Sequence, residues 1–106
     1  MIGSIALTLA LTHAAKNVKE AVDVDGIGHV DLKSFTCSDT PRSTVVQRVC
    51  YARSRRSLLV NVRGNYRAHC ELPPDVYRKF ITARSMGQFY GRTISGNATF
   101  QCRPPR

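Results

Sequence analysis

The chain has 106 residues, which is room for one small domain and excludes a multidomain architecture. Residues 1–40 contain three Lys against five Asp or Glu, a net charge of −2, whereas residues 41–106 contain thirteen Arg or Lys against two acidic residues, a net charge of +11. Twelve of these thirteen cations are Arg, whose planar guanidinium suits phosphate and carboxylate. The charge therefore indicates either a domain that binds anions or an ordinary soluble domain of high pI.

The N-terminal fifteen residues form an apolar run of the length of a signal-peptide core, and Thr12-His13-Ala14 fits a cleavage site. The run is too short to cross a bilayer, which takes about 20 apolar residues. No Lys or Arg precedes it, so a buried or membrane-surface helix is the alternative. We predict a signal-like leader over residues 1–15, no stable membrane span after its removal, and a flexible polar spacer over residues 16–35.

Residues 36–106 are predicted to form a single domain that begins with a β-meander. A turn-rich stretch over residues 36–44 precedes three segments in which apolar residues alternate, at 45–51, 58–62 and 66–70. Arg63-Gly64-Asn65 is typical of a tight hairpin turn, because Gly and Asn tolerate positive φ. The three segments therefore read as antiparallel strands.

Two helices are predicted after the meander. Pro74 suits the first position of a helix, and Asp75 favours the positive end of its dipole. Ser85 is placed to cap a second short helix that runs to Tyr90. The apolar residues of the first helix recur at helical spacing and are expected in the core: Val76, Tyr77, Phe80 and Ile81. The predicted fold class is α+β, a three-stranded antiparallel β-meander followed by two helices packed on one face.

A set of motifs in the second half of the chain resembles one known family. The motifs are Ser43-xx-Val46-xx-Val49-x-Tyr51, Leu58-x-Val60-x-Val62, Gly64, Leu72-Pro73-Pro74-x-Val76-Tyr77, Ala83-x-Ser85-x-Gly87-x-Phe89-Tyr90 and Arg92-x-Ile94. Together they look like the KTSC domain, named for its occurrence at the C-terminus of some lysyl-tRNA synthetases. The resemblance covers residues 43–96 and implies a compact β-meander with helices, and RNA binding is suggested for the family.

Three positions depart from the pattern that this resemblance implies. Arg67 and His69 stand where the family has an aromatic pair, Met86 stands where a lysine is common, and Gly91 stands where an asparagine is expected. An aromatic pair could have stacked on bases, so its loss weakens the RNA-binding interpretation.

The four cysteines indicate a disulfide framework, which belongs to exported proteins. In a regular meander Cys50 and Cys70 would both lie opposite Leu59, about 9.5 Å apart, whereas a bridge needs Cα atoms within about 7 Å. Each is therefore expected to hold an extension, preferably as Cys37–Cys50 with Cys70–Cys102, and alternatively as Cys37–Cys70 with Cys50–Cys102. Zinc is not expected, because the chain has no CxxC or HxxxH spacing.

An anion or nucleic-acid contact is the most specific site that the sequence suggests. Three arginines cluster in the first hairpin turn, and two further cations and a histidine follow; the candidate residues are Arg53, Arg55, Arg56, Arg67, His69 and Arg92. His69 is expected to be a solvent-facing strand histidine, because a catalytic pair needs a second ordered group that cannot be placed. No catalytic residue, cofactor or metal is predicted.

The leading functional hypothesis is a small exported, non-catalytic binding or accessory domain, monomeric, in the periplasm or outside the cell. Its partner is unknown and could be an anionic polymer. The second hypothesis is an RNA-binding module that uses an Arg-rich face, in the cytoplasm if the leader is not cleaved. The third is a secreted nuclease-like toxin centred on His69.

Overall fold

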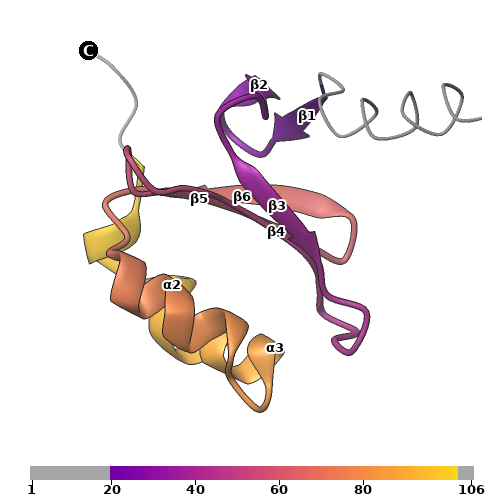
Figure 1. Cartoon of the computed structure of the whole chain (residues 1–106), viewed down its shortest axis with the longest axis vertical. Coiled ribbons are helices and arrows are strands. Elements are labelled where there is room, and N and C mark those ends of the chain that lie inside the picture. The colour runs from indigo at the N-terminus through magenta and orange to yellow at the C-terminus, as the bar shows by residue number, and fades with distance from the viewer. Residues whose placement is uncertain (1–19, 103–106) are drawn as a thin grey trace, which may run out of the picture.

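The computed structural model describes residues 20–102, and its centre is a twisted six-stranded sheet (Figure 1). Along the sheet the strand order is β2-β1-β6-β5-β4-β3. The strands are β1 (Ala21–Val24), β2 (Gly28–Asp31), β3 (Thr36–Asp39), β4 (Val46–Ala52), β5 (Ser57–Val62) and β6 (Asn65–His69).

The antiparallel meander β4-β5-β6 forms the middle of this sheet, as the alternating segments predict. Its second turn is a two-residue connection, since Val62 pairs with Asn65. Arg63 and Gly64 both have positive φ, 52° and 95°, which matches the right-handed twist of the flanking strands. The predicted register of β6 was two residues off, because Leu59 pairs with Ala68 and Cys70 lies beyond the end of the strand.

The prediction of a three-stranded antiparallel meander was wrong, because three further strands extend it into a mixed sheet. β3 pairs antiparallel with β4, and β1 pairs parallel with β6 through Val24 and Tyr66. β1 and β2 form a hairpin of their own. Each added strand has four residues, and of the three only β1 alternates between exposed and more buried side chains along its whole length. β1 and β2 pair locally, but the pairing of β1 with β6 and of β3 with β4 joins segments that are separated in sequence, and no local pattern predicts it.

A flexible spacer was predicted over residues 16–35. From Glu20 onward this segment instead forms β1, β2 and the loop into β3. Glu20 anchors its start, because the Arg48 guanidinium donates to both carboxylate oxygens at 2.7 and 3.0 Å. The Leu32 N–H also donates to the Glu20 carbonyl at 2.8 Å. The predicted leader and residues 16–19 lie outside the described residues. Within residues 20–102 no helix is both long and apolar enough to cross a membrane.

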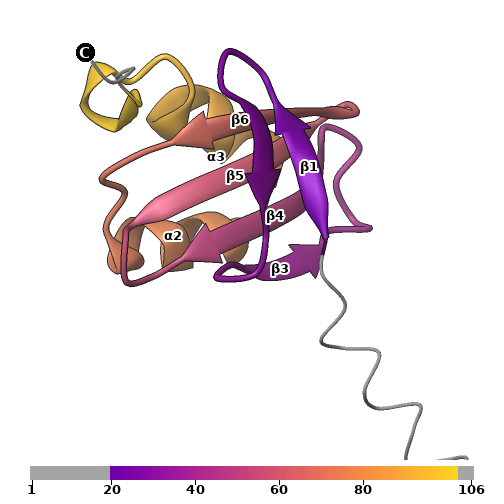
Figure 2. The same cartoon turned by 90° about the horizontal axis from the view of Figure 1, so that it is seen from above.

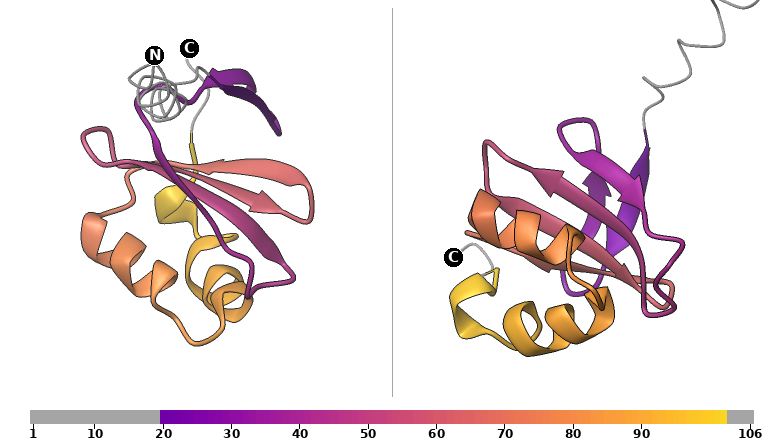
Figure 3. Two further views of the ribbon diagram at one scale, coloured as in Figure 1. Left: turned by 45° about the vertical axis from the view of Figure 1, so that its right-hand side comes forward. Right: turned by 60° about the horizontal axis from the view of Figure 1, so that its bottom comes forward.

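Two hydrophobic cores lie on opposite faces of the sheet. Figure 3 shows the corresponding layers, with the helices on one face and the N-terminal hairpin on the other. The larger core fills the space between the sheet and the helices and consists of Val46, Val49, Tyr51, Leu58, Val60, Leu72, Phe80, Tyr90, Ile94 and Phe100. The smaller core lies under the N-terminal hairpin, which crosses the other face of the sheet (Figure 2), and consists of Val24, Leu32, Cys50 and Leu59. The meander is therefore covered on both faces, with the helices on one of them.

The helical layer follows the predicted start signals. Helix α2 (Pro74–Ile81) begins at a proline and buries Phe80. Helix α3 (Met86–Phe89) is capped by Ser85, whose Oγ accepts from the Gln88 N–H at 3.3 Å. It continues into the π-helical turn η2 (Tyr90–Ile94), and the 3-10 turn η3 (Ala98–Phe100) leads to the C-terminal segment.

Candidate functional site

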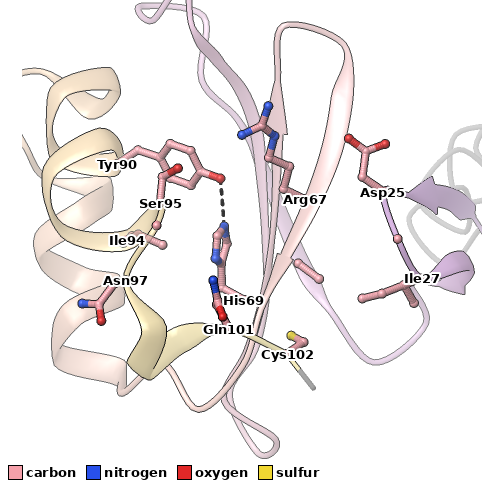
Figure 4. A pocket seen from close by; sticks show the side chains of 13 residues that line it. Asp25, Ile27, Arg67, His69, Tyr90, Ile94, Ser95, Asn97, Gln101 and Cys102 are labelled. Carbon is pink, nitrogen blue, oxygen red and sulfur yellow. Dashed lines mark hydrogen bonds between the residues drawn. The ribbon is translucent and has the colours of Figure 1, made fainter. Parts of the chain in front are cut away.

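A cleft of about 360 Å³ lies where the end of β6 meets η2 and the C-terminal segment (Figure 4). Its walls come from four parts of the chain: the β1–β2 turn, β6, η2 with the residues after it, and the segment around Gln101. The polar side chains that line it are Asp25, Arg67, His69, Tyr90, Ser95, Asn97 and Gln101.

His69 and Tyr90 form a buried polar pair at the base of this cleft. The His69 Nε2 lies 2.8 Å from the Tyr90 hydroxyl, and the His69 residue is only 8% exposed. Burial, with a smaller contribution from the nearby Arg67 charge, lowers the pKa of His69 from 6.5 to about 4. Burial also raises the pKa of Tyr90, although Arg67 and Ser95 oppose that shift. Both groups are therefore neutral at neutral pH.

The expectation that His69 faces solvent was wrong. His69 is the last residue of β6, paired with the buried Leu58, and its ring meets the Tyr90 ring edge-on at 5.3 Å. Side chains alternate along β6 as predicted. The helical turn η2 packs over the face of β6 that carries His69, so this face is not open to solvent. Arg67 lies two residues earlier on the same face of the strand and remains exposed, at the open side of the cleft.

The three arginines of the β4–β5 turn do not join this cleft. The Arg55 Nη2 donates to the Ser34 Oγ at 2.6 Å, and its guanidinium lies 5.1 Å from the centre of the Phe35 ring. That contact is on the face of the sheet covered by the N-terminal hairpin, whereas His69 faces the helical layer. Arg56 has a φ of 53°, and its carbonyl accepts from the Leu72 N–H at 2.9 Å.

The predicted set of anion-binding residues is thus divided among several surfaces. Arg67 and His69 come together at the cleft, Arg53, Arg55 and Arg56 lie together in the β4–β5 turn, and Arg92 is exposed on η2. The sequence did not indicate Tyr90 or Gln101, since an aromatic residue at helical spacing and a tail residue carry no functional signal. Within residues 20–102 no three His, Cys, Asp or Glu side chains gather as a metal ion would require.

The four cysteines form the pairing that the sequence analysis preferred. Cys37–Cys50 joins directly paired positions of β3 and β4, and Cys70–Cys102 joins the end of β6 to the C-terminal segment. That segment is also held by backbone contacts, because the Cys70 N–H donates to the Phe100 carbonyl at 2.8 Å and Gln101 pairs with His69. The second bridge therefore closes one side of the cleft.

Comparison with known proteins agrees with this architecture. The sequence profile of the KTSC domain matches residues 42–97, which is more than half of the chain. The chain belongs to the KTSC domain family. A crystal structure of a KTSC domain protein from Yersinia pestis superposes with a TM-score of 0.59 at 22% identity, covering 68% of this chain and 99% of that one. This likeness shows the fold alone, and no curated protein matches the chain in sequence.

The disulfides attach both flanks of this KTSC domain to its centre. Cys50 and Cys70 lie inside the matched segment, whereas Cys37 precedes it and Cys102 follows it. The KTSC domain of this chain is therefore a cysteine-containing variant with a covalently tied extension at each end.

Proposed function

We propose that this KTSC protein is a small exported, non-catalytic binding domain that acts in the periplasm or outside the cell. The observation that carries the proposal is the pair of disulfides, Cys37–Cys50 and Cys70–Cys102, with no free cysteine among residues 20–102. Such bridges persist in oxidising compartments and are rare in the cytosol. The apolar leader predicted over residues 1–15 would supply the route of export.

The low pKa of His69 and its contact with Tyr90 also favour a binding role over a catalytic one. A general acid or base works best when its pKa lies near the working pH, whereas the pKa of His69 is about 4. Its Nε2 is already engaged by the Tyr90 hydroxyl. His29 lies on β2, with its Nδ1 3.1 Å from the Asp23 carboxylate. These contacts argue against the nuclease hypothesis. That hypothesis requires a measurable nuclease activity, and it requires that the substitution His69→Ala abolish this activity.

Intact-mass spectrometry of protein from whole cells and from a periplasmic fraction tests the compartment. We expect a periplasmic form cleaved near Ala14, with all four cysteines oxidised. Recovery of only full-length, reduced protein from the cytoplasm would contradict export.

Nucleic-acid binding is the second candidate, because three exposed arginines gather in the β4–β5 turn: Arg53, Arg55 and Arg56. None of the three forms an ion pair with a carboxylate within residues 20–102. A contact through several arginines releases counterions, so affinity for mixed RNA or DNA should fall steeply with salt, and the double variant R53Q/R56Q should flatten that slope. If wild-type protein shows no binding near physiological salt, this candidate is eliminated.

A further inference from the structure

A second and larger cavity lies next to the His69 cleft and shares five lining residues with it: Gly26, Ile27, Ala68, His69 and Cys102. Its volume is about 750 Å³, and it opens between the N-terminal hairpin with its following loop and the outer face of β5 and β6. Pockets for small organic ligands have volumes of about 300–1,000 Å³ and are mostly apolar with a few polar groups. This cavity falls in that range.

The walls of this cavity are mainly apolar. Leu59 and Ala68, which pair across β5 and β6, form part of one wall. Val30 and Phe35 face them from the N-terminal layer, together with Ile27 from the β1–β2 turn. Ile27 is 54% exposed and is the one large apolar residue of the described chain that is exposed. An apolar ligand would remove that side chain from water, which is favourable in proportion to the area buried.

One positive charge at this cavity has no acidic partner. Arg55 lies over the Phe35 ring and within residues 20–102 forms no ion pair with a carboxylate. The other ionisable groups at the cavity already have local contacts. His29 contacts Asp23 at 3.1 Å, and the Asp31 carboxylate accepts from the Lys33 N–H at 2.9 Å.

We propose that this cavity binds a small amphipathic organic acid, with its apolar body between the hairpin and β5–β6 and its carboxylate paired to the Arg55 guanidinium. Arg presents a planar fork of N–H groups that donates two hydrogen bonds to one carboxylate, and such charge-assisted bonds are about twice as strong as neutral ones. A polyanion fits less well, because one arginine and an apolar wall do not match a chain of phosphates. The inference rests on the proposed binding role and names its ligand class.

Titration with decanoate, followed by amide chemical shifts and by calorimetry on the oxidised protein, tests this site. We expect saturable binding, with the largest shifts at Val30, Phe35, Arg55 and Leu59, which line this cavity and not the His69 cleft. Arg55→Gln should weaken decanoate binding about tenfold, because the carboxylate loses its guanidinium partner. The affinity for decanol should stay unchanged, because decanol has no carboxylate. Arg53→Gln in the same turn, whose side chain does not line the cavity, is the matched control and should bind decanoate as wild type does.

Three outcomes would overturn the inference: no saturable binding, shifts confined to Tyr90, Ser95 and Asn97, which line only the His69 cleft, or equal weakening by the Arg53 and Arg55 variants. The two proposals fail separately. Periplasmic, fully oxidised protein that ignores decanoate would refute this ligand class and leave export standing, whereas cytoplasmic reduced protein would refute export alone.

Discussion

His69 and Tyr90 form a neutral pair whose stability should depend on pH. The pKa of His69 is about 4 in the folded chain against 6.5 ordinarily, so between these values the unfolded chain binds more protons. The contribution of this pair to the free energy of unfolding should therefore be fully present above pH 6.5 and decline as the pH falls towards 4. Between pH 7 and pH 5 we expect a loss of about 2 kcal/mol, measured by urea unfolding.

A pair of variants isolates this contribution from the carboxylates that also titrate in acid. His69→Gln removes the titrating ring and should abolish most of the pH dependence between 7 and 5. His29→Gln, on the exposed strand β2, should keep it. Equal pH dependence in wild type and His69→Gln would show that His69 does not carry the effect.

At the scale of single elements, the β5–β6 turn depends on a glycine. Gly64 has a φ of 95°, where a side chain costs about 1–2 kcal/mol, so Gly64→Ala should lower the free energy of unfolding by that amount. Gly91→Ala is the control, because Gly91 lies in η2 with no positive φ and nothing within 4 Å of an added Cβ. It should leave stability unchanged or raise it by up to about 1 kcal/mol. Similar losses in both variants would contradict the turn argument.

The N-terminal hairpin should open before the meander does. β1 joins β6 through the single pair Val24 and Tyr66, whereas β4 and β5 form six pairs with one irregularity between Val46 and Arg48. Segments with few buried contacts exchange amide hydrogens through local opening rather than global unfolding. Hydrogen exchange should therefore be faster at residues 21–31 than at residues 57–62. Equal protection of the two ranges would mean that the hairpin and the meander unfold as one unit.

The thermal stability of the whole molecule should depend on both disulfides, and more on the disulfide that closes the longer loop. Loop-closure entropy gives about 3 kcal/mol for Cys37–Cys50, which are 13 residues apart, and about 4 kcal/mol for Cys70–Cys102, which are 32 apart. Thermal unfolding of the two double-serine variants should show the larger fall in Tm for Cys70 and Cys102. A reducing agent should not change the Tm of a variant that lacks all four cysteines. A larger loss from the shorter loop would contradict the entropic account.

Much of the central architecture could be predicted because its signals are local. Alternation along β4 and β5, the Arg63-Gly64 turn and Pro74 at the start of α2 each act within a few residues. The cysteine pairing was predicted only as a preference between two alternatives, and the register on which that preference rested was two residues off, since Cys70 lies beyond β6. The family resemblance rests on the same local motifs and agrees with the KTSC match over residues 42–97.

The sequence by itself therefore determined the three central strands, the start of the helical layer and the family. Only the tertiary structure decided that β1, β2 and β3 extend the sheet, that η2 buries His69, and that Arg55 borders an apolar cavity. The physical reason is the range of the interactions. The four-residue strands and the strand histidine have little preference of their own, and their environment is set by other segments of the chain: Glu20 contacts Arg48, Cys37 pairs with Cys50, and His69 contacts Tyr90.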